Sequence, residues 1–327
     1  MKAAVLVEKE RFEIREIPLP ERGDKDILVK ITHCSVCNGT DAKLYHGIHK
    51  LSVFPCLIGH ECAGIVEWTG KDVTRFRVGD RVLGGVFRGT EQYPAIWGGY
   101  AEYGVCGEND LLPIPEGVNL EEATLAVMLG ESLNAVRIGE VNPSDTVGIM
   151  GCGAVGLSIL TVVRHSFPQK IIAFDISEEK LALAKEMGAD EVINPTKQGS
   201  AEQVMALTEG KGLSKMFEAT GRAEAYDLLY ETAARNGVII PFGIAGGPIS
   251  VPFPSIYSRQ LQIRWCAAAG DYNSLYKSAA LHMLKHGFVD KRMITSVMPL
   301  DQIEEAFAKI AQGNEVRVII QMNGGAL

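Results

Sequence analysis

The chain of 327 residues lacks the features by which several classes of protein are recognised. Its 32 Lys and Arg are outnumbered by 40 Asp and Glu, so the net charge of -8 leaves no basic excess for binding nucleic acid. Its seven cysteines are an odd number in a chain long enough to build its own core. A disulfide framework is therefore disfavoured, and a reducing compartment, the cytoplasm, is expected.

Long apolar runs are also scarce, which argues against a membrane protein. Residues 1–8 contain too short an apolar run for a signal peptide. The stretch 146–163 has no charged residue over 18 positions, the lower limit for a membrane-spanning helix, but four glycines interrupt it. A buried strand, a glycine turn and a buried helix explain this stretch better, so no membrane segment is expected.

Glycine, in contrast, is abundant at 35 residues, and the length favours two domains. The first third has alternating apolar and polar residues at 27–32 and in parts of 61–68 and 79–83, a pattern typical of short antiparallel strands. Asn119 is suited to cap a helix whose first turn carries Glu121 and Glu122. A β-rich domain is therefore expected at the N-terminus.

From residue 146 the pattern changes to strands that alternate with helices, which predicts a doubly wound α/β domain with a parallel sheet. The predicted strands are 147–150, 171–174, 215–217, 237–242 and 262–267, and the predicted helices are 155–164 and 178–187. The tail has helical patterns at 275–285 and 301–311 and a last strand at 316–321. Periodicity alone leaves open which domain this tail joins.

The segment Gly151-Cys152-Gly153-Ala154-Val155-Gly156 matches the dinucleotide fingerprint G-x-G-x-x-G, between a predicted strand and a predicted helix. Its three glycines would allow a tight turn, close approach of the pyrophosphate, and close packing of helix on strand. Ala154 and Val155 open the helix, whose N-terminal amides would face the phosphates. The alternative is a purely structural glycine turn.

Asp175 ends the next predicted strand, about 20 residues beyond the fingerprint. A carboxylate at this place would accept hydrogen bonds from the adenosine ribose and repel a 2′-phosphate, which favours NAD over NADP. In the alternative reading, Asp175 caps the helix that follows.

Two segments of the first third carry residues that bind metals, Cys34-Ser35-Val36-Cys37 and Gly59-His60-Glu61. A thiolate, an imidazole and a carboxylate suit zinc, and three protein ligands with an open position mark a catalytic site. Cys34 and Cys37 could instead form a redox pair, or Cys34 could be a small buried residue of a strand.

The motifs that carry a family resemblance are Gly59-His60-Glu61-x-x-Gly64 with Val78-Gly79-Asp80, Gly98-Gly99-Tyr100-Ala101-Glu102-Tyr103, Leu133-Asn134-Ala135-Val136, the fingerprint, and Leu300-x-x-Ile303-x-x-Ala306-Phe307. With them the chain resembles the zinc-dependent medium-chain dehydrogenase/reductase family, which includes alcohol, sorbitol and threonine dehydrogenases, over essentially its whole length. The resemblance implies a chaperonin-10-like catalytic domain at 1–132 and 269–327 and an NAD-binding Rossmann domain at 133–268.

The resemblance also implies roles for single residues. Cys37 and His60 fall on zinc-ligand positions, Thr40 on the hydroxyl that relays the substrate proton, and Asp41 on the carboxylate behind the ligands. Glu61 matches an acid that binds zinc directly in sorbitol-type members.

The third ligand and the outer proton path stay open. Either Glu61 or Glu131, on the helix before the Rossmann fold, would complete the zinc site. Lys43 stands where many members have a relay histidine, with His46 and His49 nearby. Because residues 83–107 contain a single cysteine, one catalytic zinc and no structural zinc are expected.

The resemblance therefore implies an enzyme that transfers hydride between NAD and a secondary alcohol, polyol or sugar alcohol, acting as a homodimer or homotetramer. A metal-free quinone or enone reductase with the same fold and a non-enzymatic cofactor-binding protein are the alternatives. Partners other than the small-molecule substrate and a second copy of the chain are not expected. Trp97 and Tyr93 could shape the substrate pocket or simply pack.

Overall fold

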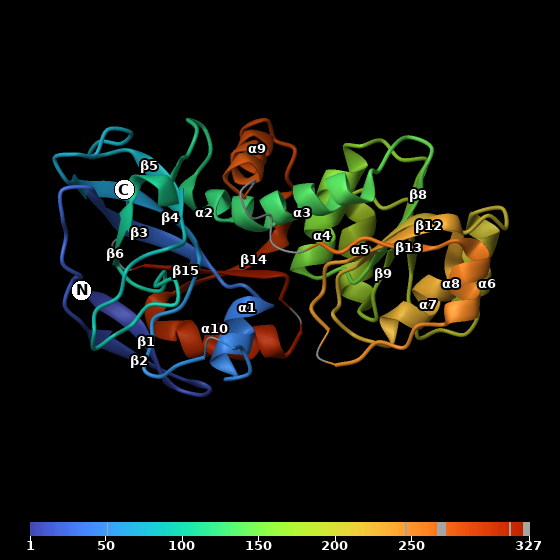
Figure 1. Ribbon diagram of the computed structural model, residues 1–327, viewed down its shortest axis with the longest axis horizontal. Coiled ribbons are helices and arrows are strands. Elements are labelled where there is room, and N and C mark those ends of the chain that lie inside the picture. The colour runs from blue at the N-terminus through green and yellow to red at the C-terminus, as the bar shows by residue number, and fades with distance from the viewer. Residues whose placement is uncertain (51, 246, 267–272, 314, 323–327) are drawn as a thin grey trace. The chain divides into compact units, whose positions relative to one another are not determined.

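The computed structural model describes residues 1–50, 52–245, 247–266, 273–313 and 315–322 (Figure 1). The chain divides into two compact units. Unit 1 comprises Met1–Val127, Leu281–Gly287 and Lys291–Leu327, and unit 2 comprises Met128–Ala280 and Phe288–Asp290. The end of the chain thus belongs with its beginning, a point that periodicity left open. The domain boundary expected at 268/269 lies outside the described residues.

Unit 1 is built on a seven-stranded sheet in the order β14-β15-β3-β4-β5-β7, with β6 paired to β3 beside this path. The strands β1 and β2 form a separate antiparallel hairpin. The bounds are β1 (Lys2–Glu8), β2 (Arg11–Glu16), β3 (Asp26–Ser35), β4 (Glu61–Thr69), β5 (Arg81–Gly84), β6 (Tyr103–Gly107), β7 (Leu112–Pro113), β14 (Ile294–Pro299) and β15 (Arg317–Gln321). The expected antiparallel, β-rich N-terminal part is confirmed.

The helical segments of unit 1 are short. They are α1 (Thr40–Tyr45), η1 (Glu108–Asp110), α2 (Leu120–Ala123), η3 (Lys291–Met293), η4 (Leu300–Gln302) and α10 (Ile303–Ala311). Asn119 caps α2 as expected, because its side chain accepts a hydrogen bond from the Glu122 amide. The apolar face of α10, with Ala306 and Phe307, is buried in the core of this unit.

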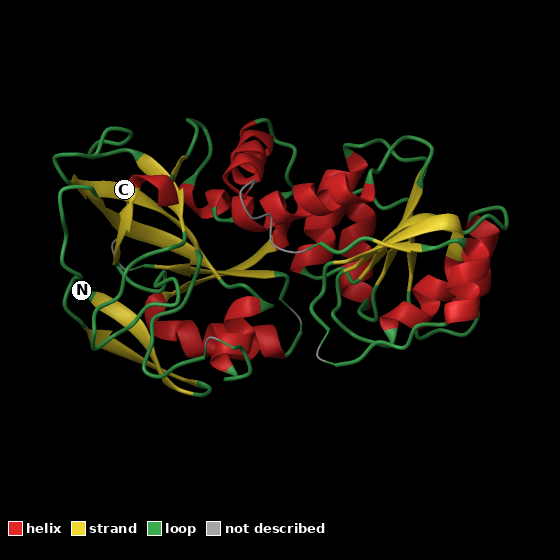
Figure 2. Ribbon diagram, in the orientation of Figure 1, coloured by secondary structure: helices red, strands yellow, loops and turns green. Residues whose placement is uncertain are grey.

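Unit 2 holds a six-stranded sheet in the order β10-β9-β8-β11-β12-β13, and every neighbouring pair is parallel. This is the Rossmann order, with β8 as the first strand. The bounds are β8 (Thr146–Met150), α4 (Ala154–Arg164), β9 (Lys170–Phe174), α5 (Glu178–Glu186), β10 (Glu191–Ile193), α6 (Ser200–Leu207), β11 (Leu213–Glu218), α7 (Ala225–Thr232), β12 (Ala233–Pro241), α8 (Phe253–Arg259) and β13 (Gln262–Ile263). Figure 2 shows helices on both faces of this sheet.

The expected doubly wound parallel sheet is therefore confirmed, with corrections to single elements. The stretch 146–163 is the strand β8, a glycine turn and the helix α4, and no helix among the described residues is long and apolar enough to cross a membrane. The strand expected at 262–267 has only two residues, and Ala267 lies outside the described part. The helix expected at 301–311 starts as the separate turn η4. The three-residue strand β10 and the helices α6, α7 and α8 were not predicted, since short elements depend strongly on their neighbours.

Two longer helices, α3 (Leu125–Gly139) and α9 (Asn273–Lys285), each contain one boundary between the units, and the segment Phe288–Asp290 after α9 is assigned to unit 2 again.

Candidate metal site and dinucleotide-binding turn

Three of the predicted metal ligands come together in unit 1. A thiolate sulfur of Cys37, a ring nitrogen of His60 and a carboxylate oxygen of Glu61 all lie within 4.8 Å of one another. The sheet explains this, because β3 and β4 are antiparallel neighbours and Ser35 pairs with Glu61. Residues just after β3 and just before β4 therefore meet at one end of the sheet.

Asp41 holds two of these ligands from behind. Its side chain is fully buried and accepts hydrogen bonds from the Cys37 amide (3.1 Å) and the Tyr100 hydroxyl (2.6 Å). His60 Nδ1 lies 3.0 Å from the other carboxylate oxygen. This contact fixes Nδ1–H as the donor and leaves Nε2 to face a metal.

Glu61 is held by a residue that the sequence did not reveal. Arg317 on β15 is 1% exposed, and its Nη2 lies 3.2 Å from Oε2 of Glu61, while its Nη1 donates to the Val36 carbonyl (2.8 Å). Glu61 itself is 3% exposed, and its Oε2 makes no hydrogen bond with any described atom. The signal was a single arginine within the apolar run 316–320, since a buried charge requires a partner.

The charges of the site act on one another. Burial would raise the pKa of the Cys37 thiol, but the hydrogen bond and charge of His60 outweigh burial and lower it. Burial opposes the charged form of His60, yet the nearby Asp41 carboxylate raises the pKa of the imidazole well above its ordinary value. Negative charge on Cys37, Asp41 and Glu61 therefore gathers around the imidazole, as a cation site requires.

These side chains fit a zinc ion. A thiolate, an imidazole with a carboxylate behind it, and a buried carboxylate are the donors that a catalytic zinc uses.

The turn between Cys37 and α1 contains Asn38, one residue more than the family pattern. Despite this extra residue, Thr40 and Asp41 stay close to Cys37. The Thr40 amide donates to Cys37 Sγ (3.3 Å), and the Asp41 amide donates to the Cys37 carbonyl (3.1 Å). Asn38 Oδ1 is buried and has no hydrogen-bond partner among the described atoms.

Glu131, the other predicted third ligand, is on α3, in unit 2, and its role stays a prediction. His46 pairs with Glu10 near the surface (2.8 Å), and Cys34 is buried with its sulfur 3.2 Å from that of Cys62.

The fingerprint forms a tight turn in unit 2. Gly151 has a φ of +96°, and a Cβ at Gly156 would lie 1.7 Å from the Gly151 carbonyl oxygen. Gly153 precedes α4 as its N-cap, and no described atom lies within 4 Å of the place where its Cβ would be. The space beside Gly153 and the free amides of α4 provide the close approach that a pyrophosphate needs.

Asp175 lies directly after β9, beside this turn. Its carboxylate accepts hydrogen bonds from the Cys152 amide (2.7 Å) and the Ser177 amide (2.9 Å). The helix α5 is capped by Ser177, whose side chain accepts from the Lys180 amide. Asp175 is thus not the helix cap, contrary to the alternative reading.

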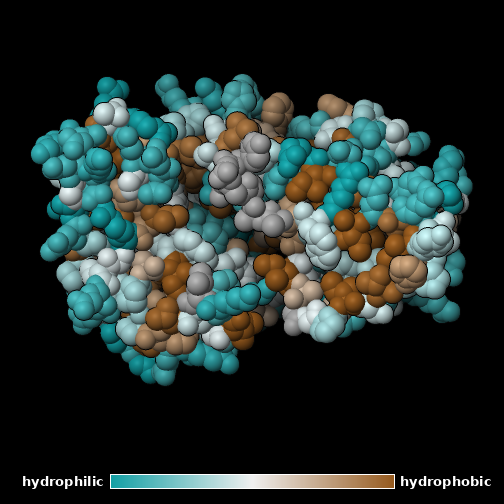
Figure 3. Space-filling model, viewed as in Figure 1, coloured by the Kyte–Doolittle hydropathy of each residue, from teal (hydrophilic) through white to brown (hydrophobic). Residues whose placement is uncertain are grey.

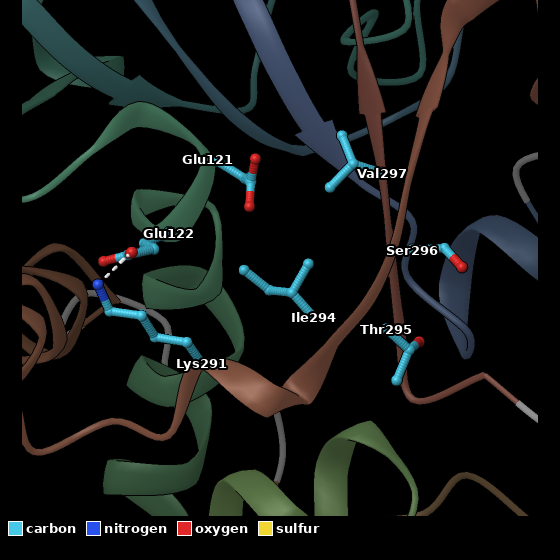
Figure 4. Close-up of a pocket in the computed structure, with 7 residues that line it drawn as sticks. All are labelled: Glu121, Glu122, Lys291, Ile294, Thr295, Ser296 and Val297. Carbon is cyan, nitrogen blue, oxygen red and sulfur yellow. Dashed lines mark ion pairs between the residues drawn. The ribbon is translucent and has the colours of Figure 1, made fainter.

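A cavity of about 240 Å³ lies elsewhere in unit 1, between α2, η3 and β14 (Figure 4). None of the predicted site residues lines it. Its acids are Glu121 and Glu122, and Glu122 is paired with Lys291 (2.5 Å), as Figure 4 shows.

Comparison with known proteins agrees with this architecture. Residues 23–116 match the alcohol dehydrogenase GroES-like domain and residues 154–285 match zinc-binding dehydrogenase. D-arabitol-phosphate dehydrogenase of Enterococcus avium is 27% identical over 338 residues, covering 94% of this chain and 93% of that protein.

Solved structures are similar over nearly the whole chain. Alcohol dehydrogenase TADH from Thermus sp. ATN1 has a TM-score of 0.86 at 25% identity, covering 99% of this chain and 100% of that one. A structure from Sinorhizobium meliloti 1021, described as a zinc-binding dehydrogenase bound to NADP, has a TM-score of 0.88 at 24% identity and covers 98% of each chain.

A GroES-like domain that carries a Cys, His and Glu cluster, joined to a Rossmann domain, defines an oxidoreductase of the zinc-type dehydrogenase class. The chain belongs to the zinc-dependent medium-chain dehydrogenase/reductase family, as its motifs indicated.

Proposed function

We propose that this protein transfers hydride between NAD and a secondary alcohol, polyol or sugar alcohol, using one zinc ion per chain. The observation that carries the proposal is the cluster of Cys37, His60 and Glu61, with ligand atoms within 4.8 Å of one another. Asp41 contacts His60 and Arg317 contacts Glu61, and these contacts hold the two ligands in position. A thiol, an imidazole and a carboxylate with ligand atoms this close together form a donor set suited to zinc.

Each residue has a distinct task in this proposal. Cys37, His60 and Glu61 would hold the zinc ion, which supplies a positive charge that makes an alcohol proton easier to remove. Asp41 keeps the His60 ring oriented through Nδ1. Thr40, which begins α1 directly beside Cys37, passes the substrate proton outward through its hydroxyl, while Arg317 restrains Glu61.

Metal content and turnover test the proposal together. We expect about one zinc per chain by elemental analysis, and NADH formation, followed by its absorbance, with at least one member of a panel of alcohols and polyols. Cys37→Ala should remove zinc and activity while NADH still binds, because the glycine turn does not use this thiol. Absence of zinc, with reduction of quinones or enones by NADPH, would establish the metal-free reductase instead.

Cys34→Ala is the matched control, because Cys34 lies three residues before Cys37 and is buried against Cys62. It should keep both zinc and turnover. Equal loss in the two variants would favour a Cys34–Cys37 redox pair and contradict the zinc assignment.

The preference for NAD rests on Asp175. Its carboxylate lies at the end of β9, within hydrogen-bond distance of the amide of Cys152 in the fingerprint. A negative charge there attracts ribose hydroxyls and repels the 2′-phosphate of NADP, the cofactor bound in the Sinorhizobium meliloti structure. Asp175→Asn should lower the ratio of kcat/KM for NAD to that for NADP about 10- to 100-fold. An unchanged ratio would refute the ribose contact.

Association of two copies is part of the proposal. In unit 2, Phe253, Tyr257 and Trp265 are 69%, 75% and 69% exposed, beside the edge strand β13. Figure 3 shows apolar side chains gathered on the visible face of this unit. Such exposed patches mark interaction surfaces. Light scattering should give the mass of a dimer or tetramer, which Phe253→Asp with Tyr257→Asp should reduce and the control Phe167→Asp, also at an exposed residue of unit 2, should not.

A further inference from the structure

The backbone at Trp97 adopts a conformation that its side chain disfavours. Its φ is +124°, a value that glycine adopts readily but that is sterically strained for a bulky residue. The residue that follows, Gly98, also has a positive φ of +79°. Strain of this kind persists only where the surroundings enforce it, and it is concentrated at functional sites.

The surroundings of Trp97 do enforce it. The Ile96 amide donates to the Leu57 carbonyl (2.8 Å), and the Gly99 amide donates to the Gly59 carbonyl (2.9 Å). The Trp97 carbonyl accepts from the Phe87 amide (2.8 Å). The chain around Trp97 is thus bound along residues 57–59, directly before His60.

The result is an indole placed against a metal ligand. The ring centroids of Trp97 and His60 are 4.7 Å apart, with 50° between the ring planes, and the ring of His49 lies 6.5 Å from the indole. The side chain of His60 is 20% exposed, whereas that of Glu61 is 3% exposed. Cys37 is half-buried like His60, so the solvent-facing side of the ligand cluster is that of Cys37 and His60, and the indole lies beside His60 on this side.

We propose that Trp97 is the residue that sets the size of the alcohols this protein accepts. The proposal rests on the function proposed above and names its substrate more closely: alcohols whose carbon substituent next to the indole is small. The indole is partly buried against the hydrophobic core of unit 1, so it forms an apolar wall beside His60. A bulky substituent would meet this wall, whose backbone is held by hydrogen bonds on both sides.

Turnover of paired substrates tests the size limit. The probes are 2-butanol and 1-cyclohexylethanol, oxidised with NAD by the zinc-loaded protein. Trp97→Ala should raise the ratio of kcat/KM for the bulky alcohol to that for the small one at least about 10-fold. Trp68→Ala is the matched control, since Trp68 is in the same unit, is 37% exposed and faces Arg22 instead. An unchanged ratio in Trp97→Ala, or an equal change in Trp68→Ala, would overturn the proposal.

Fluorescence provides a readout that does not depend on turnover. Adding Co²⁺ to the metal-free protein should quench indole emission, because Trp97 lies beside a ligand of the metal. Trp97→Phe should abolish most of this quenching, while Trp68→Phe should retain it. Quenching that survives in Trp97→Phe would show that the indole is not at the metal site and would overturn the proposal.

The thermal stability of Trp97 variants tests whether the backbone at this residue is strained. Trp97→Gly should melt about 3 °C or more above Trp97→Ala, since glycine adopts a φ of +124° without cost. A lower melting temperature for Trp97→Gly would contradict the strain. Failure of the proposed function would give a different result from failure of the Trp97 proposal. In that case the wild-type protein would contain no zinc or would oxidise neither alcohol.

Discussion

The metal cluster of unit 1 and the glycine turn of unit 2 are built from different parts of the amino acid. The cluster consists of buried side chains, Cys37, His60 and Glu61, and each depends on another residue for its position. The turn consists of backbone: Gly151 bends it, Gly156 packs against it and α4 offers its amides. The metal cluster is therefore sensitive to the loss of a side-chain functional group, whereas the glycine turn is sensitive to the addition of a Cβ atom.

The two sites also differ in how far their parts are separated along the chain. The turn is contained within six residues, whereas the cluster combines residues 37, 60 and 61 with Arg317 from the last strand. Burying charges is favourable only when each finds its partner, so the cluster links the two ends of the chain. The glycine turn does not depend on charged partners from distant parts of the chain. Three sets of substitutions test this contrast, in order of the size of the expected effect.

Arg317→Met should have the largest effect on stability. It leaves the buried Glu61 carboxylate without its cation, which costs about 3–5 kcal/mol in the free energy of unfolding. The loss should appear in denaturant unfolding of the zinc-free protein. Lys309→Met is the control, because its ion pair with Glu305 is at the surface, and it should change stability by less than about 1 kcal/mol. Equal effects would show that the buried pair does not link β15 to the metal site.

Gly156→Ala and Gly153→Ala should separate packing from binding in the turn. A Cβ at residue 156 would lie 1.7 Å from a carbonyl oxygen, so the first variant should lose about 1–3 kcal/mol of stability and its NADH binding. A Cβ at residue 153 meets no described atom, so the second variant should fold normally but bind NADH about 10- to 100-fold more weakly.

Calorimetry of binding and thermal unfolding of both variants would measure the difference, and each should keep its zinc. Undiminished NADH affinity in Gly153→Ala would mean that no pyrophosphate approaches this glycine.

Tyr100→Phe should have the smallest effect, and one confined to the metal. It removes the hydroxyl that donates to Asp41 but keeps the ring between Phe12 and Phe307, so zinc affinity should fall about 10-fold. Competition with a chromophoric chelator measures this affinity. Tyr45→Phe is the matched control, because Tyr45 packs on the same two rings but donates to the Glu10 carbonyl. Equal zinc affinities in the two variants would remove Tyr100 from the support of the site.

The sequence predicted the local parts of both sites, but not the contacts between residues far apart along the chain. The fingerprint, the strand before it and Asp175 were identified because strand, turn and helix are local, and periodicity reports local structure. The segments that contain Cys37, His60 and Glu61 were recognised by residue types that bind zinc, and the family resemblance singled out these three residues. Arg317 was missed, because its partner lies 256 positions away along the chain. The strained backbone of Trp97 has no signature in composition or spacing.

The sequence by itself determined the parallel sheet, the glycine turn and the metal-binding residue types, because these follow from short-range patterns and side-chain chemistry. Periodicity left open where the tail of the chain goes, and the family resemblance placed it with the first domain. Only the tertiary structure decided that β15 pairs with β3 and brings Arg317 to Glu61. Pairing between distant strands depends on the packing of a whole sheet, and no local pattern specifies which strands become neighbours.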